Sequence, residues 1–540
     1  MASPIFGDKL ADFHDIAYSS YSPDDVAKLL AANQTLPVSI ASFKVQGAGS
    51  KTRSSFLRAQ IDPLVNAPAT RTLPELLKQL DATARRFKRF GTYSAAEFKL
   101  DLATVTPYKA LLAAENESSS SPDFASDDNP LHEPYRGIKP LDLKATLILT
   151  QANPHPIHLK SVVRDNGPAA FSATAALKNL LGGAETLSIV ASRETSPTAS
   201  ASYAAEFSAP LCIKSPDNRV HLSAFSTDNT AAYPSLAFAT GARGASLKLV
   251  ANSPCHPASF AEFGVATVQR TLSDLGSASE TVKNTPAQST KTSVYSRFAI
   301  DLRTSKPDSP LFVDGGYLLD WQTEAAGLGD ASKISGDVAF LKTQAVAQAS
   351  KSLDPENDHI VFSAAAGTGL LWSYARPGYA QSSTFYDRFF LGGPNGGISA
   401  SSSSPPGVFL HAYTPSGLGP RDGADAIGGD AYAAGSVSVL LKLPRLTRGF
   451  AAEYLAPLRV LAYFTQASLI EGSTAPDRSV RSLYKSIFDS PTTSGGLGLI
   501  YRTSAAQLEL IYSAPFVVPS SAEAAVRKGW QLGVGFDVDL

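Results

Sequence analysis

The chain has 540 residues, and its 47 Lys and Arg residues nearly balance its 48 Asp and Glu residues, giving a formal net charge of -1. That balance excludes an electrostatic case for nucleic-acid binding. No apolar run reaches the roughly 18 to 20 residues that a membrane-spanning helix needs, which excludes a helical membrane protein. The two cysteines, Cys212 and Cys255, are too few for a disulfide framework or, by themselves, a zinc site. We expect no secretory signal, because the N-terminus lacks a basic segment followed by an apolar core.

The N-terminal part of the chain is predicted to hold one small α/β domain. Residues 1–37 are predicted to be an extension with one short helix near 24–32, and residues 38–151 to form the domain. Its predicted elements are a strand at 38–45, helices at 53–65 and 73–90, and strands at 96–102 and 141–150. The helix at 73–90 has apolar residues at the spacing of one helix face, which predicts a single buried stripe. A Ser-, Asp- and Pro-rich stretch at about 113–137 is predicted to be a disordered insertion.

Residues 155–540 contain a long series of segments with a two-residue period, separated by Gly, Pro, Ser and Asp clusters. Several exceed the roughly five or six residues usual for soluble strands and approach the roughly 9 to 11 residues of a tilted membrane strand. The sixteen predicted strands lie near 157–165, 168–178, 185–194, 200–209, 219–228, 242–252, 259–272, 292–304, 316–327, 336–349, 358–373, 430–443, 457–470, 494–503, 505–514 and 528–540.

The alternation of polar and apolar side chains along these segments helps to decide whether water or lipid surrounds the strands. From Trp530 to Leu540 apolar residues alternate with Gln531, glycines and aspartates. This pattern fits a soluble β-sandwich with its apolar face inward, or a membrane barrel with its apolar face outward. Strand length, strand count, terminal aromatics and opposite charges on one face of neighbouring strands favour the barrel, which must close because lipid cannot hydrogen-bond an exposed edge. The predicted fold class is mostly β: a 16-stranded antiparallel transmembrane β-barrel at 155–540, preceded by the α/β domain.

Four stretches carry a resemblance to a known family. They are Phe389-Phe-Leu-Gly-Gly-Pro-Asn with Leu418-Gly-Pro-Arg-Asp-Gly-Ala-Asp-Ala-Ile-Gly-Gly-Asp-Ala-Tyr, then Gly182-Gly-Ala-Glu-Thr-Leu, and the terminal Gly529-Trp-Gln-Leu-Gly-Val-Gly-Phe-Asp-Val. They resemble the core barrel of the mitochondrial sorting and assembly machinery (the SAM or TOB complex), which is kin to the bacterial insertase BamA. The resemblance covers roughly residues 38–540. It implies that the N-terminal domain is a POTRA domain and that a long sixth loop lies at about 380–429.

The resemblance also implies a function. It implies a membrane insertase, not an enzyme, that inserts and folds β-barrel precursor proteins into the mitochondrial outer membrane, with the POTRA domain in the intermembrane space. No cofactor and no metal are implied. The implied partners are the precursors, peripheral metaxin-like subunits, the outer-membrane translocase, small intermembrane-space chaperones and the lipid bilayer, with no nucleic acid. The alternative functions are a passive outer-membrane pore and a polypeptide-translocating barrel.

The expected mechanism depends on the seam where the first and last barrel strands meet. Unpaired backbone groups are costly in lipid, so the seam opens only if another strand replaces the lost partner by β-augmentation. We expect the glycines of the last strand to weaken the seam, and Asn166-Gly-Pro168 to limit the pairing of the first strand. The candidate residues are Gln531, Gly533, Val534, Phe536 and Val538, which match the terminal signal of mitochondrial barrels, and Ile157, Leu159, Ser161 and Val163 at the edge of the first strand.

Loop six supplies the remaining candidate residues. They are Gly392, Gly393, Pro394, Arg421, Asp422, Gly423, Gly428 and Gly429. The resemblance implies that the loop folds into the lumen as a plug or brace, whereas its composition alone fits a long exposed loop. Family members carry a hydrophobic-Arg-Gly-Phe motif just after the Gly-Gly-Pro, with the arginine folded back into the lumen, but residues 395–409 contain no arginine. Either another residue such as Arg421 anchors the loop, or the loop is partly disordered, or this stretch reflects a gene-model error.

Other chemical signals have simpler structural explanations. His155 and His158 flank Pro156 and lack further ligands nearby, so they do not predict a metal site. The glycine-rich stretch at 392–397 lacks the Lys-Ser/Thr of a phosphate loop, and no nucleophile, base and orienting residue form a catalytic set. The basic run at 85–89 is interpreted as a solvated helix face, with contact to precursors or anionic headgroups as the alternative.

Overall fold

The computed structural model separates the chain into two compact units. Unit 1 comprises residues 1–154, 179–184 and 213–216, and unit 2 comprises the remainder. The described residues are 37–66, 71–102, 141–164, 169–195, 200–229, 238–306, 310–328, 336–354, 360–374, 383–393, 405–423, 425–442, 455–472, 485–489 and 491–539. Within these ranges, no helix is both long enough and apolar enough to cross a bilayer.

Some predictions fall on residues outside the described ranges. These are the helix near 24–32, the insertion at about 113–137, Pro394 and the stretch at 395–404 where the arginine motif was expected.

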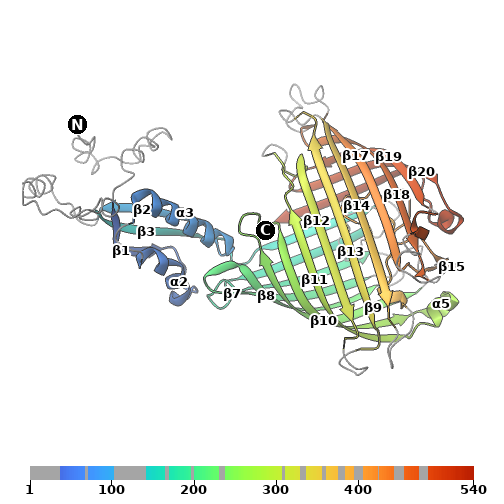
Figure 1. The fold of residues 1–540 in the computed structure, drawn as a ribbon, viewed down its shortest axis with the longest axis horizontal. Coiled ribbons are helices and arrows are strands. Elements are labelled where there is room, and N and C mark those ends of the chain that lie inside the picture. The colour runs from blue at the N-terminus through green and yellow to red at the C-terminus, as the bar shows by residue number, and fades with distance from the viewer. Residues whose placement is uncertain are drawn as a thin grey trace, which may run out of the picture. The chain divides into compact units, whose positions relative to one another are not determined.

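Unit 1 contains the predicted order of strand, helix, helix, strand, strand (Figure 1). The elements are β1 (Val38–Gln46), α2 (Ser54–Val65), α3 (Leu73–Arg89), β2 (Tyr93–Leu102) and β3 (Leu141–Gln151). The sheet order is β1-β3-β2, with β1 parallel and β2 antiparallel to β3. This arrangement confirms the small α/β domain of POTRA type. β2 begins earlier than the predicted position 96, beyond a register irregularity between Tyr93 and Ala95.

The sequence of α3 explains how this helix forms. Thr72 and Glu75 form a capping box at its start, where backbone N–H groups otherwise lack partners. Basic residues occupy its last turn, where they interact favourably with the helix dipole. Its apolar face buries Leu76, Leu80 and Phe87 against the sheet and α2. The predicted stripe is confirmed, and the helix is held mainly by the apolar area it buries.

Two turns distant in sequence belong to unit 1. In the turn at 179–184, Asn179 Nδ2 donates to Thr52 Oγ1 at 2.9 Å, and the backbone N–H of Arg53 donates to Gly182 O at 2.9 Å. Ala184, at φ 66°, is 1% exposed and packs in the same core as α2 and α3. The Gly182-Gly-Ala stretch is therefore part of the core contacts of unit 1.

Unit 2 is a closed barrel of sixteen strands, and each strand overlaps one predicted segment (Figure 1). The strands are β4 (Ile157–Arg164), β5 (Ala169–Lys178), β6 (Thr186–Thr195), β7 (Ala201–Cys212), β8 (Ser215–Asn229), β9 (Ala239–Asn252), β10 (Phe260–Ser273), β11 (Gln288–Asp301), β12 (Gly315–Ala326), β13 (Phe340–Ser352), β14 (Ile360–Ser373), β17 (Ala431–Lys442), β18 (Leu458–Ile470), β19 (Thr492–Arg502), β20 (Ala506–Val517) and β21 (Gly529–Asp539). The ring closes by antiparallel pairing of β21 with β4. The predicted strand count and closure are confirmed.

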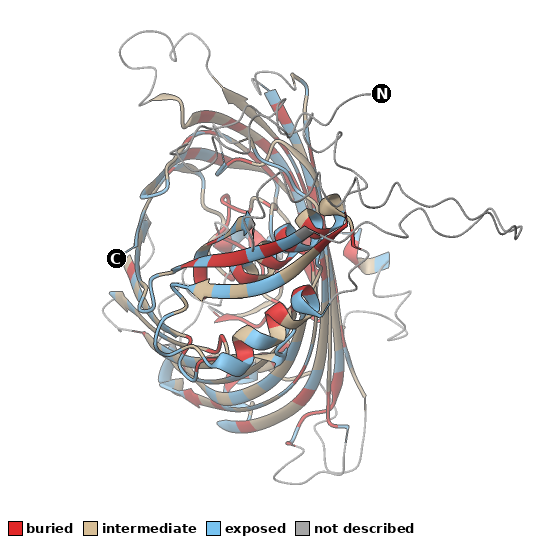
Figure 2. Ribbon diagram, turned by 90° about the vertical axis from the view of Figure 1, so that its left-hand side faces the viewer, coloured by how far each residue is buried: buried red, intermediate tan, exposed pale blue. Residues whose placement is uncertain are grey.

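The two faces of the barrel wall differ in polarity, and exposure alternates along the strands (Figure 2). On the outer face, Phe298 and Trp321 are opposite each other on β11 and β12, and they are 45% and 60% exposed. On the inner face, the Arg297 guanidinium pairs with the Asp320 carboxylate at 2.6 Å. Apolar side chains outside and paired charges inside are the arrangement that a lipid environment requires of a closed barrel. The soluble sandwich alternative is excluded.

Candidate functional site

The first and last strands form the seam of the barrel. β21 pairs with β4 from Gly533 opposite Arg164 to Asp539 opposite His158. The predicted seam residues occupy this ladder: Val534 is opposite Val163, Phe536 opposite Ser161, and Val538 opposite Leu159. Phe536, Val538, Leu159 and Val163 are between 41% and 50% exposed, so these residues form an apolar outer face along the seam.

The ladders that hold β4 are short. β4 pairs with β21 at seven positions and with β5 at six, whereas β9 and β10 pair at fourteen. With eight residues, β4 is the shortest strand of the barrel, and residues 165–168 after it lie outside the described ranges. Each backbone hydrogen bond contributes only about 0.5–1.5 kcal/mol net in water, so a shorter ladder is easier to separate. Among the described residues, β4 is therefore the barrel strand with the fewest backbone pairs to its neighbours.

Gly535 leaves space in the seam. A Cβ atom at this position would lie 3.5 Å from Val162 Cγ2 and 3.6 Å from the Ser161 carbonyl oxygen, which are ordinary contact distances. An alanine side chain would therefore fit at this position without a steric clash. The absence of a side chain removes packing between β21 and β4, which weakens the strand locally.

Loop six packs on the inner wall of the barrel. It begins with η3 (Phe385–Asp387) and contains a small hairpin of β15 (Arg421–Asp422) and β16 (Asp425–Ala426). Several of its described apolar residues are almost fully buried in one cluster with residues of β14, β17 and β18. Those loop residues are Leu391, Val408, Leu410, Ala412, Tyr413 and Leu418. In the described part of the loop, the backbone thus follows the wall and occupies lumen space.

Loop six is joined directly to the segment that leads into the last strand. Tyr413 forms an isolated bridge with Val526. On either side of it, the N–H of Thr414 donates to Ala525 O at 2.8 Å, and the N–H of Arg527 donates to Ala412 O at 2.7 Å. The loop is therefore joined by backbone hydrogen bonds to the segment that precedes β21.

Gln531 extends this connection into β21 itself. Its Nε2 donates a 2.7 Å hydrogen bond to the carbonyl oxygen of His411, and its side chain is buried. The His411 ring in turn packs against the rings of Phe409 and Tyr463, with centroid distances of 5.9 Å to each. The structure thus brings the predicted signal-like residue of the last strand into contact with predicted loop six.

Two loop-six glycines are required by close backbone approach. Gly392 has φ +126°, and a Cβ there would lie 2.4 Å from the Thr414 carbonyl oxygen. Gly428 has φ +69°, with the corresponding distance to Phe389 O being 2.8 Å. Both conformations disfavour residues other than glycine. Gly393 and Gly429 take part in bridges with Leu410 and Phe389, respectively.

The start of loop six is held by a buried charge network. The Asp387 carboxylate is 2.6 Å from the Arg270 guanidinium and 3.7 Å from Lys291 Nζ, and it accepts a hydrogen bond from Thr384 at 2.7 Å. Burial opposes ionisation of Asp387, but these two cations and the hydrogen bonds from Arg270 and Thr384 outweigh it and hold the pKa of Asp387 below its ordinary value. Lys342 Nζ also donates to the Asp387 carbonyl oxygen at 2.7 Å.

Arg388, the residue after Asp387, forms ion pairs with a different part of the barrel. The Arg388 guanidinium is 2.8 Å from the Glu471 carboxylate and 3.7 Å from that of Asp430. Asp430 directly precedes β17, and Glu471 directly follows β18. Successive opposite charges, Asp387 and Arg388, thus tie the loop to β10 and β11 on one side and to the ends of β17 and β18 on the other.

The predicted residues Arg421, Asp422 and Gly423 form the hairpin of loop six. Arg421 Nη1 donates to Gly417 O, within the same loop, at 3.3 Å. Asp422 accepts from the N–H of Thr281 at 3.0 Å, and the fully buried Asp425 accepts from the N–H of Ser279 at 2.7 Å. These N–H groups belong to the start of α5 (Glu280–Lys283) and its cap, where carboxylates are favourable.

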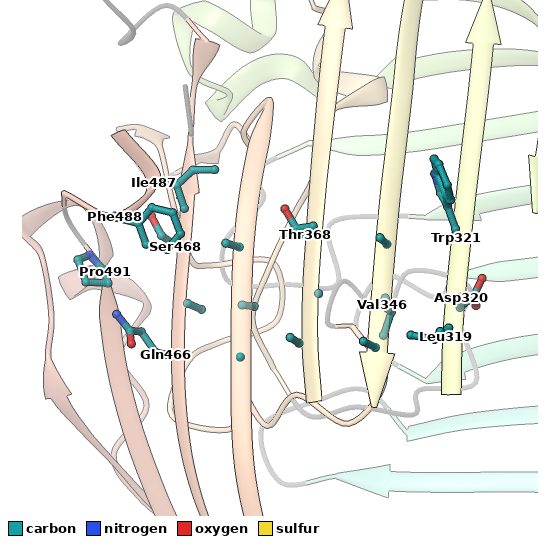
Figure 3. Close-up of a pocket in the computed structure, with 18 of the residues that line it drawn as sticks. Leu319, Asp320, Trp321, Val346, Thr368, Gln466, Ser468, Ile487, Phe488 and Pro491 are labelled. Carbon is teal, nitrogen blue, oxygen red and sulfur yellow. The ribbon is translucent and has the colours of Figure 1, made fainter. Parts of the chain in front are cut away.

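A groove of about 740 Å³ lies away from the seam, on the outer wall formed by β12–β14, β17 and β18 (Figure 3). Its lining is mostly small or apolar, with Leu319 and Trp321 at one side and Phe488 at the other. Such a surface suits contact with hydrocarbon chains rather than catalysis. Among the described residues, no group of three or more His, Cys, Asp or Glu side chains is arranged to hold a metal ion.

Sequence reasoning missed the residues that anchor loop six. Asp387 immediately precedes the Arg388-Phe-Phe-Leu-Gly-Gly stretch, and His411 follows the position of the absent arginine motif. Nothing in their local sequence indicates their partners, since Arg270 and Gln531 lie more than a hundred residues away. The available signal was the charge of Asp387 close to the apolar Phe389-Phe-Leu segment of loop six.

Comparisons with known proteins agree with this geometry. The Omp85 superfamily domain matches residues 179–538. A SAM50-like protein of Schizosaccharomyces pombe is 28% identical over 518 residues, covering 95% of this chain and 93% of that protein. The human sorting and assembly machinery component 50 homolog is 30% identical over 260 residues, 48% of each chain. Among solved structures, BamA from Haemophilus ducreyi lacking POTRA domains 1–3 shares the fold, with a TM-score of 0.66, 14% identity, and coverage of 93% of this chain and 85% of that one.

Proposed function

This chain belongs to the Omp85 superfamily, and we propose that it inserts and folds β-barrel precursors in the mitochondrial outer membrane through a lateral gate between β4 and β21. Its barrel-assembly role in an outer membrane is supported by the similarity to sorting and assembly machinery proteins over most of the chain and by the closed sixteen-stranded barrel. The gate and the exchange of strands go beyond that similarity.

The observation that carries the gate proposal is the short seam. Among the described residues, seven positions join β4 to β21, and Gly535 contributes no side chain to that ladder opposite Val162. In lipid, each unpaired backbone group costs several kcal/mol, so β4 separates from β21 only as another strand takes its place. A client strand with the pattern of β21 pairs with β4 by β-augmentation, and the backbone remains hydrogen-bonded throughout the exchange. Such an exchange of like for like needs no nucleotide hydrolysis.

The packing of loop six supports the assembly role rather than the passive-pore alternative. Its apolar residues are buried against β14, β17 and β18, and Gln531 ties it to the last strand. A passive pore gains nothing from a loop that occupies the lumen and contacts the seam strand. In the assembly role, loop six holds β21 in place until a client strand competes for β4.

Partners follow from the same role. We expect the clients to be β-barrel precursors carrying a terminal strand that resembles Gln531–Val538. We also expect peripheral metaxin-like subunits, delivery by the outer-membrane translocase and small intermembrane-space chaperones, and the POTRA domain in the intermembrane space.

The test is cysteine crosslinking between β4 and a client during import. A Ser161→Cys chain, with Cys212→Ser and Cys255→Ser, receives an imported barrel precursor with a single cysteine in its terminal strand. We expect crosslinking with an intact terminal signal and none when the signal is mutated. Equal crosslinking of both precursors contradicts the gate. A Thr174→Cys chain, with the cysteine on neighbouring β5, is the control that reports non-specific proximity.

A further inference from the structure

The inner face of the seam pairs acids on β21 with bases on β4. Asp537 is opposite Lys160, and Asp539 is opposite His158. His158 Nδ1 and the Asp539 carboxylate are in direct hydrogen-bonding contact. Charged side chains directly opposite each other on neighbouring strands stabilise the pair when their signs differ and destabilise it when they agree.

Among the described residues, β5 offers no charge in register with Lys160 or His158. On the β5 side, the residues opposite Lys160 and His158 are Ser172 and Thr174, which are uncharged. On the β20 side, the N–H of Asp537 bonds to the carbonyl oxygen of Ala505. The two basic residues of β4 are therefore matched in register by β21 alone.

A cavity of about 280 Å³ lies at the same place and is lined by Lys160, Asp537, Arg502, Glu509 and Gly535, among others. Within it, Arg502 and Glu509 pair with each other at 3.1 Å. The charge of Glu509 is thus already matched within the wall, and Lys160 faces Asp537 across the seam.

We propose that β4 selects client strands by charge as well as by backbone pairing, taking terminal strands with carboxylates at the positions of Asp537 and Asp539. This selection rests on the strand exchange proposed above. When β21 leaves, Lys160 and His158 face the incoming strand. Four and six residues after the glycine at the position of Gly533, the acidic side chains fall on the inner face and alternate with the outward apolar residues at the positions of Phe536 and Val538. A strand with lysines there places a like charge opposite Lys160 and removes the carboxylate that bonds to His158.

The test uses the full chain in lipid vesicles, with Ser161→Cys, Cys212→Ser and Cys255→Ser, and peptides of the sequence 529–539 that carry Phe536→Cys. One peptide keeps both acids, and the other carries Asp537→Lys with Asp539→Lys. We expect the acidic peptide to crosslink with roughly tenfold higher apparent affinity, since each opposed pair contributes about 0.2–1 kcal/mol and like charges act in the opposite direction. In a barrel with His158→Glu and Lys160→Glu, the preference should reverse.

A Lys178→Glu barrel is the matched control, because Lys178 lies on β5 away from the seam, and it should retain the preference for the acidic peptide. Equal crosslinking of both peptides in the native and charge-reversed barrels overturns charge selection and leaves the gate standing. Failure of every peptide to crosslink at Ser161→Cys overturns the gate and the selection together.

Discussion

The side-chain amide of Gln531 donates a 2.7 Å hydrogen bond to the backbone carbonyl of His411, joining the last strand of the barrel to loop six. Two backbone hydrogen bonds, Thr414 to Ala525 and Arg527 to Ala412, lie close to it. Together they couple the position of β21 to the position of a loop that Asp387 anchors on β10 and β11 and that Arg388 anchors at the ends of β17 and β18. The seam strand is thus held from the lumen as well as by its neighbours.

Gln531→Ala should loosen this connection. The variant leaves the His411 carbonyl without its donor, which should destabilise the contact by about 1–3 kcal/mol because the group is buried. Hydrogen exchange should accelerate at the amides of Thr414 and Arg527. Gln466→Ala, on the exposed face of β18, is the control and should leave those amides unchanged. Unchanged exchange in the Gln531 variant would show that the loop is held without this bond.

Gly535→Ala should tighten the seam. The new methyl group reaches Val162 at 3.5 Å without a clash, and alanine loses less conformational entropy than glycine, so the strand should gain about 0.5–1 kcal/mol. A tighter seam should slow strand exchange, and clients should insert more slowly. Gly435→Ala in β17 also has space, with the nearest atom at 3.8 Å, and should leave insertion kinetics unchanged. Faster insertion with Gly535→Ala would contradict a gate that is limited by the opening of the seam.

Asp387→Asn should release the start of loop six. Breaking a buried ion pair leaves Arg270 without its charge partner and typically costs about 3–5 kcal/mol. We expect a lower melting temperature and protease cleavage within loop six. Asp81→Asn, which removes the exposed Arg85–Asp81 pair, should have almost no effect. A melting temperature equal to that of the native chain would show that Asp387 does not anchor the loop.

The Asp387 network also predicts a response to acid. The pKa of Asp387 in the folded chain lies below its ordinary value, so the stability it contributes is present above the unfolded pKa of about 3.9. That contribution is lost as the pH falls through the lower folded pKa. As the pH falls between these two pKa values, the native chain should lose this stability. The Asp387→Asn variant has no carboxylate at this position and should not show that loss. Parallel acid-unfolding curves for the two chains would contradict this assignment.

The barrel could be predicted from the sequence because its signal is local. Alternation in β21 from Trp530 onward, repeated in each of the other strands, specifies strands with one apolar face, and lipid requires them to close. The POTRA helix stripe at Leu76, Leu80 and Phe87 is equally local. The contacts that anchor loop six are not local in the sequence. Asp387 and Arg270 are 117 residues apart, and Gln531 and His411 are 120 apart, so their meeting depends on closure of the whole ring rather than on any sequence pattern.

The most direct test of the gate is a disulfide across the seam. Ser161 and Phe536 are paired in register, so a chain with Ser161→Cys and Phe536→Cys, free of Cys212 and Cys255, can be locked by oxidation and opened by reduction. A chain locked between Leu249→Cys and Phe263→Cys, paired in register on β9 and β10, is the control. A lateral gate predicts that the oxidised seam blocks client insertion, that reduction restores it, and that the control lock has no effect. Insertion at the unlocked rate through an oxidised seam would contradict the gate.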